Sequence, residues 1–135
     1  MGARYFIHIE RLPCLGFRRR VLRCPQGAGF VTLALPTARP RLRVYRVGAA
    51  DDEEAPLLIF FRDSTNARGS YPAGRFVELI PEGGGRYLVD FNRARNPYCA
   101  YSTIFPCPAP WPGNSLATAI AAGERYQPAG LPATP

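Results

Sequence analysis

Short runs of apolar residues, several of them alternating with polar ones, are separated by prolines and glycines along this chain. Alternation with a period of two is typical of β-strands, and a continuous apolar run indicates a strand buried on both faces. The sequence predicts strands at residues 5–9, 17–24, 30–35, 42–47, 57–61, 75–80 and 86–91. One helix is predicted over residues 114–122, where Asn114 or Ser115 would cap the first turn and Gly123 would end it.

A glycine-rich turn at residues 81–85 lies between two of these alternating runs, which favours an antiparallel hairpin. The sequence therefore predicts a mainly β fold, either an antiparallel β-sandwich or a partly closed barrel, with one short C-terminal helix. We expect residues 1–126 to form a single β domain. Residues 127–135 are rich in proline and alanine and are predicted to be a flexible tail.

The composition is that of an ordinary globular domain, with 135 residues, 47% of them hydrophobic and 20% charged. Its longest apolar runs are much shorter than a membrane-spanning helix needs. Residues 1–13 lack the continuous apolar core of a signal peptide. We therefore expect a soluble protein located in the cytoplasm.

The basic residues are all arginine, and the formal net charge is +7. Arginine presents a planar fork of donors that suits carboxylates and phosphates. Arg39, Arg41 and Arg43 alternate, so their side chains should share one face of a strand. This face is either simply solvated or contacts an anionic partner. Nucleic acid is the less favoured partner, because no recognised nucleic-acid-binding motif accompanies the charge.

Four cysteines are present: Cys14, Cys24, Cys99 and Cys107. Their spacing does not form the CxxC pattern of a zinc knuckle, and no metal site is predicted. Reduced thiols are the default without an export signal, with a Cys99–Cys107 disulfide, metal ligation or a catalytic thiol as alternatives. A catalytic thiol needs a base, and the single histidine, His8, lies in a predicted strand.

Between residues 60 and 126, polar side chains of distinct chemistry stand between short apolar runs and turn-forming residues. Such positions fall at strand ends and in loops, where binding sites usually form. Aromatic residues in the same stretch, from Tyr71 to Trp111, would either wall a small-molecule site or cover one end of the core. The candidate ligand-binding residues are Arg62, Asp63, Thr65, Tyr71, Arg75, Asp90, Asn92, Asn96 and Tyr101, with Cys99 and Cys107 as a disulfide or thiol pair.

The order of residues in this stretch resembles a family of bacteria and archaea known as domain of unknown function 1684. The resemblance covers about half of the chain and includes a Gly-Arg pair, an Asp-Phe-Asn block and an Asn-Pro-x-Cys-Ala-Tyr block. It implies a shared fold and site, but it implies no reaction. The matching positions are Phe61, Asp63, Thr65, Tyr71, Gly74, Arg75, Asp90, Phe91, Asn92, Asn96, Pro97, Cys99, Ala100, Tyr101, Cys107, Pro108, Ala122, Gly123 and Glu124.

Three functional hypotheses follow from these residues. The first is a binding module that holds a small anionic ligand in the Arg/Asp/Asn/Tyr-lined site. The second is an interaction or structural subunit that contacts a protein partner through arginine-rich faces. The third is an enzyme in which Asp63 or Asp90 acts as acid and base while arginine stabilises charge, with no cofactor specified. A cross-strand pair of Arg75 with Asp90 is also consistent with the pattern.

An enzyme should surround a deep, open cavity with these polar groups. An interaction subunit should instead bury them against one another.

Overall fold

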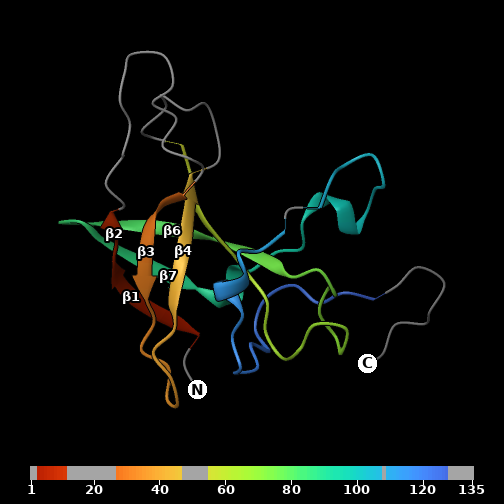
Figure 1. The fold of residues 1–135 in the computed structure, drawn as a ribbon, viewed down its shortest axis with the longest axis horizontal. Helices are drawn as coiled ribbons and strands as arrows, with labels where there is room; N and C mark the ends of the chain where they lie inside the picture. The colour runs from red at the N-terminus through yellow and green to blue at the C-terminus, as the bar shows by residue number, and fades with distance from the viewer. Residues whose placement is uncertain (1–2, 12–26, 47–54, 108, 128–135) are drawn as a thin grey trace.

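The computed structural model describes residues 3–11, 27–46, 55–107 and 109–127. Within them, strands form one antiparallel sheet in the order β1-β7-β6-β5-β4-β3-β2 (Figure 1). The predicted mainly β, antiparallel fold is confirmed. The strands are β1 Arg4–His8, β2 Glu10–Arg11, β3 Gly27–Thr32, β4 Arg41–Arg46, β5 Leu57–Phe61, β6 Arg75–Gly83 and β7 Arg86–Asp90.

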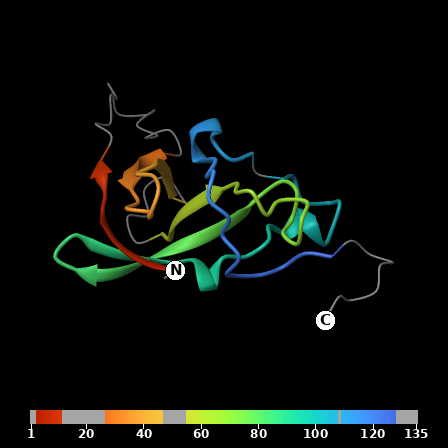
Figure 2. The ribbon, with the colours of Figure 1, turned by 90° about the horizontal axis from the view of Figure 1, so that it is seen from below.

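The two edge strands of this sheet are neighbours in the chain. β1 pairs with β7 at one edge, β2 pairs with β3 at the other, and only Ile9 separates β1 from β2. Because one residue cannot span an open sheet, the sheet must curl until its edges meet. The sheet is therefore nearly closed into a barrel, which is the second of the predicted alternatives (Figure 2).

The predicted hairpin is formed by β6 and β7. Gly84 and Gly85 make its turn with φ of 62° and 77°, a combination that a two-residue type I′ turn requires and that glycine adopts without strain. β6 extends to Gly83, beyond the predicted end at residue 80, because a register shift between Pro81 and Gly83 lets the pairing continue past the proline.

The core lies inside the barrel and is built from the inward-facing residues of alternating strands. In β5, for example, Leu57, Ile59 and Phe61 are buried while the residues between them are half-buried. The continuous apolar run at residues 57–61 predicted a strand buried on both faces, and the observed burial of the second face is less complete than that. The fully buried hydrophobic side chains are Val31, Leu33, Leu42, Val44, Ile59, Phe61, Val77, Val89 and Phe91.

The predicted helix over residues 114–122 is wrong. The helical elements in the described residues are three single 3₁₀ turns: η1 Phe91–Arg93, η2 Tyr98–Ala100 and η3 Pro112–Asn114. We call residues 112–126 the C-terminal segment, drawn in blue in Figure 1. Its backbone bonds to the barrel instead of to itself: Leu116 donates its N–H to the Arg62 carbonyl at 2.7 Å, and Leu116 and Ile120 enter the core.

Several sequence-based predictions fall outside the described residues. These are the strand at residues 17–24, Cys14 and Cys24, and the tail from residue 128 onward. Among the residues that are described, no helix has the length and apolar character needed to cross a membrane.

Candidate functional site

Arg75, the first residue of β6, lies under the C-terminal segment and is only 2% exposed. Its Nη2 donates to the Ile120 carbonyl at 2.7 Å. Its Nη1 donates to the carbonyls of Ala122 at 2.7 Å and Glu124 at 3.2 Å. The guanidinium also lies 5.3 Å from the centre of the Phe61 ring. Arg75 therefore holds an irregular segment whose carbonyls would otherwise be buried without donors.

Asp63 follows β5 and supplies the negative charge next to Arg75. Its Oδ1 is 3.6 Å from Arg75 Nη2, and its Oδ2 accepts the Ile120 N–H at 2.6 Å. The Thr65 hydroxyl is 3.0 and 2.9 Å from the two carboxylate oxygens and donates to them. Burial lowers the pKa of Arg75, and the Asp63 charge opposes that effect. We call Asp63, Thr65 and Arg75 the buried cluster.

Gly74 places Arg75 at the start of its strand. Gly74 has φ of 105°, and a Cβ atom there would lie 2.6 Å from the Phe61 carbonyl oxygen. Only glycine accepts this backbone conformation and this close approach together. The Gly-Arg pair in the sequence thus reflects how tightly β6 begins against the end of β5.

Asn96 and Tyr101 meet Glu124 next to the buried cluster. The Tyr101 hydroxyl donates to Glu124 Oε1 at 2.6 Å and accepts from Asn96 Nδ2 at 2.9 Å. Burial and the bond to Glu124 raise the pKa of Tyr101. Because the Glu124 carbonyl also accepts from Arg75, Glu124 joins the two groups of side chains. Glu124 matches the family pattern in sequence, but its convergence with Tyr101 depends on the path of the C-terminal segment.

Asp90 and Asn92 lie apart from the buried cluster, at the start of the η1 turn. The Asp90 carboxylate accepts from the Asn92 N–H at 3.1 Å, from Asn92 Nδ2 at 2.9 Å and from Arg4 Nε at 3.2 Å. The predicted pairing of Asp90 with Arg75 is wrong, because β7 pairs with residues 79–83 of β6 and Asp90 faces Arg4 on β1. Asp90 is a capping residue that joins β1 to the end of β7.

Asp90→Asn should remove part of the acid sensitivity of the fold. Burial alone would raise the pKa of Asp90, but the bonds from Asn92 and Arg4 hold it below its usual value. A carboxyl with a lowered folded-state pKa stabilises the fold above its unfolded pKa of about 3.9, and that contribution is lost as pH falls through the folded pKa. We expect Asp90→Asn to cost about 1 kcal/mol near neutral pH.

Urea denaturation across the acid range tests this. The free-energy difference between Asp90→Asn and the unmodified chain should shrink below about pH 4. A difference that stays constant with pH would contradict the capping role.

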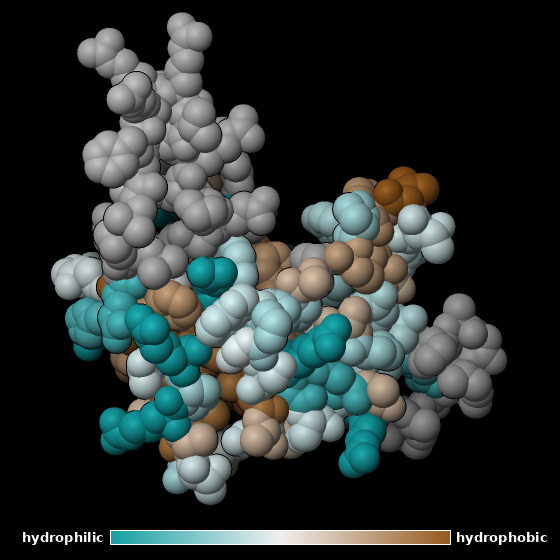
Figure 3. All heavy atoms as spheres, in the orientation of Figure 1, coloured by the Kyte–Doolittle hydropathy of each residue, from teal (hydrophilic) through white to brown (hydrophobic). Residues whose placement is uncertain are grey.

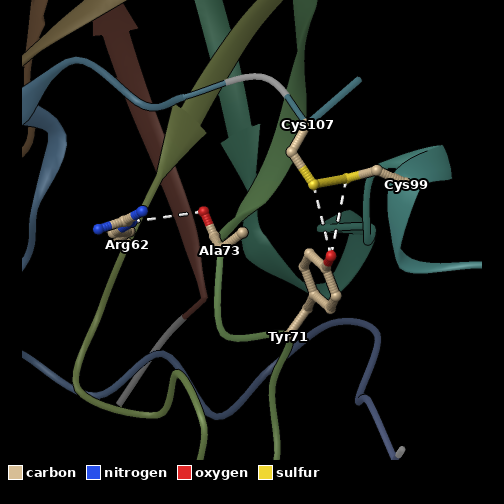
Figure 4. Close-up of a disulfide and its surroundings, with 5 residues drawn as sticks. All are labelled: Arg62, Tyr71, Ala73, Cys99 and Cys107. Carbon is tan, nitrogen blue, oxygen red and sulfur yellow. Dashed lines mark hydrogen bonds between the residues drawn. A yellow bond between two sulfur atoms is a disulfide. The ribbon is translucent and has the colours of Figure 1, made fainter. Parts of the chain in front are cut away.

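Tyr71 lies against a disulfide that joins Cys99 to Cys107 (Figure 4). Its hydroxyl is 3.4 Å from Cys107 Sγ and 3.8 Å from Cys99 Sγ. The disulfide alternative therefore holds for this pair, and the default expectation of reduced thiols is wrong for it. Arg62 is exposed and donates from Nε to the Ala73 carbonyl at 3.4 Å. In the described part of the chain, no group of His, Cys, Asp and Glu residues could hold a metal ion.

One surface, formed by residues of β3, β4 and Trp111, was not predicted from the sequence. Arg41 Cζ lies 3.9 Å from the centre of the Phe30 ring. Arg43 Cζ lies 5.5 Å from Phe30 and 5.4 Å from Trp111, and the two rings meet edge to face at 5.7 Å. We call Phe30, Arg41, Arg43 and Trp111 the arginine–aromatic face. The alternation of Arg41 and Arg43 predicts that they share one face of a strand. Trp111 is close to Tyr71 in sequence and was therefore expected beside it, not beside these arginines.

Asn114 is fully buried and holds the backbone of Arg43, one of the residues of the arginine–aromatic face. Its Oδ1 accepts the Arg43 N–H at 2.7 Å, and its Nδ2 donates to the carbonyls of Arg43 at 3.0 Å and Phe60 at 2.8 Å. β4 and β5 pair directly only at Tyr45–Leu58 and Arg46–Leu57, so the Asn114 amide bridges the two strands where they separate. The sequence had suggested a helix cap for this residue.

Together, the fold and these contacts define a small, nearly closed antiparallel β-barrel domain with a buried polar cluster under its C-terminal segment. The chain belongs to the family described as protein of unknown function (DUF1684), whose model matches residues 21–125. It is also similar to the solution NMR structure of an uncharacterized protein of Haloarcula marismortui. That similarity has a TM-score of 0.72 and 30% identity, over 92% of this chain and 71% of the other. No curated protein matches the chain significantly.

Proposed function

We propose that this protein is an interaction module that binds an acidic segment of a protein partner on its arginine–aromatic face. The observation that carries the proposal is the fixed position of two guanidinium groups over the Phe30 and Trp111 rings. The planar guanidinium is attracted to the face of the ring, and its fork of donors is preorganised, so less conformational freedom is lost for each hydrogen bond that it forms with a carboxylate. Tryptophan, tyrosine and arginine are also the residues most enriched at the centres of protein interfaces.

The buried cluster supports a structural role rather than a small-ligand site. The Nη atoms of Arg75 are engaged by backbone carbonyls, and Asp63 is engaged by Thr65 and Ile120. An anionic ligand would have to displace these partners and enter a site from which solvent is excluded. A recess of about 170 Å³ does occur in the described residues, but its lining is mostly apolar. It lies between Tyr5, Phe91 and residues 119–122.

The same contacts give little support to an enzyme that uses aspartate as acid and base. A general acid or base works best when its pKa is near the working pH. The hydrogen bonds of Asp90 hold its pKa low, and Asp63 is enclosed by donors from the fold itself. An interaction subunit should bury these polar groups against one another, and the contacts of Asp63, Thr65 and Arg75 support that interpretation.

An acidic protein segment suits this surface better than nucleic acid does. Single-stranded nucleic acid binds by stacking bases on free aromatic faces. Phe30 is only 8% exposed and lies beneath Arg41 and Arg43. A Cβ atom at Gly113 would overlap the Trp111 ring, so that ring packs directly against the Gly113 backbone. Arg41 and Arg43 thus cover the Phe30 ring, and guanidinium groups pair with carboxylates bidentately. Arg41 Nη2 donates to Glu10 Oε2 at 3.0 Å in an exposed pair, so an acidic segment would compete with Glu10 for this arginine.

Titration with poly-L-glutamate tests the proposal, because Trp111 is the single tryptophan of the chain and its emission reports directly on this face. We expect a saturable change in Trp111 emission that weakens as salt rises. Arg43→Gln should lower the affinity about tenfold, because it removes a charge-assisted pair. Arg86→Gln is the matched control, since Arg86 stacks on Phe6 at 4.7 Å but lies on β7, which β6 and β5 separate from β4.

Two results would overturn the proposal. One is equal loss of affinity in Arg43→Gln and Arg86→Gln, which would mean nonspecific attraction to the positive net charge. The other is tighter binding of an oligothymidylate of matched charge than of poly-L-glutamate, with stronger Trp111 quenching, which would assign the face to nucleic acid.

A further inference from the structure

The Cys99–Cys107 disulfide lies at the base of a loop that protrudes from the barrel. This loop is seen at the upper right of Figure 1, and Figure 3 shows a strongly hydrophobic residue at its tip. Ile104 is 82% exposed, and the rings of Tyr98 and Phe105 pack together at 5.3 Å. Cys107 is exposed and Cys99 is half-buried. A thiol in solution can therefore approach Cys107 without unfolding of the barrel.

The Tyr71 hydroxyl is held next to both sulfur atoms. Its ring packs edge to face against Tyr126 at 4.8 Å, and its carbonyl accepts from Asn66 Nδ2 at 2.9 Å and from the Gly74 N–H at 3.0 Å. A disulfide sulfur carries no hydrogen, so the hydroxyl is the donor in its contacts with Cys107 and Cys99. A donor at this position can stabilise a thiolate that forms when the disulfide opens.

We propose that Cys99–Cys107 is a site of reversible thiol–disulfide exchange in which Tyr71 stabilises the departing thiolate. The thiolate of an external thiol attacks Cys107 Sγ, forms a mixed disulfide, and breaks the bond to Cys99. Cys99 leaves as a thiolate and accepts a hydrogen bond from the Tyr71 hydroxyl. A second external thiol attacks the mixed disulfide and leaves with the first as their own disulfide.

The complete reaction transfers two electrons from the external thiols to the Cys99–Cys107 disulfide. Two external thiols are oxidised to one disulfide, and their two protons are taken up by the thiolates of Cys99 and Cys107. The co-reactant is thus a low-molecular-weight thiol or a protein dithiol. Reduction removes the covalent closure of the loop that carries Ile104 and Phe105, while the bonds of Tyr101 to Glu124 and Asn96 keep the start of the loop attached.

The test follows the reduction of this disulfide by dithiothreitol in the folded protein. Cleavage after arginine releases residues 96–125 as one peptide that contains both cysteines, so alkylation and mass measurement report on this pair alone. We expect a rate proportional to the dithiothreitol concentration. Tyr71→Phe should reduce about tenfold more slowly, because a hydrogen bond to a charged sulfur is lost. Tyr98→Phe is the matched control, since Tyr98 neighbours Cys99 but packs on Phe105.

A second measurement separates stabilisation of the thiolate from a change in packing. In the reduced protein, the pH dependence of Cys99 alkylation gives the pKa of that thiol, and Tyr71→Phe should raise it. Circular dichroism confirms that the variants are folded. The proposal is overturned if Tyr71→Phe leaves both the rate and the Cys99 pKa unchanged, or if it accelerates reduction. It is also overturned if reduction is independent of dithiothreitol concentration, since that would require prior unfolding, or if the native protein yields both cysteines as free thiols.

Discussion

Arg75→Met is expected to lower the free energy of unfolding by about 3 to 5 kcal/mol, because it leaves the Asp63 carboxylate buried without its countercharge. Three carbonyls of the C-terminal segment would lose their donors in the same variant. A domain of ordinary stability has about 5 to 15 kcal/mol in total, so the variant should be largely unfolded if the barrel is near the lower end. The loss should release the C-terminal segment from the barrel.

Urea denaturation followed by circular dichroism measures this change. Arg62→Met is the matched control, because Arg62 is exposed and near the same loop, and we expect a change within about 0.5 kcal/mol. Asp63→Leu combined with Arg75→Met should recover part of the loss, since no uncompensated charge then remains. An Arg75→Met protein as stable as the unmodified chain would show that the buried cluster does not hold the fold.

Asn114→Ala should cost about 3 to 5 kcal/mol, because it strands three backbone groups in the interior at about 1 to 3 kcal/mol each. The Arg43 N–H and the carbonyls of Arg43 and Phe60 would lose their partner where β4 and β5 separate. The variant should also loosen the arginine–aromatic face, since Arg43 and Trp111 lie on either side of this bridge. We therefore expect weaker binding of poly-L-glutamate by any folded fraction.

Thermal and urea unfolding compare Asn114→Ala with Asn92→Ala. Asn92 is exposed and its side chain bonds only to Asp90 among the described contacts, so its removal should cost about 1 kcal/mol or less. Similar losses in the two variants would contradict the bridging role of Asn114.

The strands could be predicted because each buries one face and therefore alternates along the chain. β5 matches its predicted range, and the β6–β7 hairpin follows from the glycines at its turn. The helix over residues 114–122 failed for a physical reason. Local propensity favoured it, but Asn114 bonds to β4 and β5, Leu116 bonds to Arg62 and Ile120 bonds to Asp63. Those tertiary bonds replace the helical ones.

The candidate site was predicted as a set of residues but not as an arrangement. Asp63, Thr65 and Arg75 do meet, and Asn96 and Tyr101 meet Glu124 beside them. Their partners are mostly backbone groups of residues 120–125, and no local pattern reveals where an extended segment will cross a barrel. The arginine–aromatic face could not be predicted for the same reason, because the contact of Trp111 with Phe30 joins residues 81 positions apart in the chain.

The proposed binding at the arginine–aromatic face is tested most directly by locating the arginines that contact poly-L-glutamate. In isotope-labelled protein, the Nε–H signals of individual arginines and the Trp111 indole signal can be followed by NMR during titration with poly-L-glutamate. We predict that the signals of Arg41, Arg43 and Trp111 shift progressively while that of Arg75 stays in place. Shifts of the Arg75 signal with the Arg43 signal unchanged would contradict binding at the arginine–aromatic face and would place the binding site at the buried cluster.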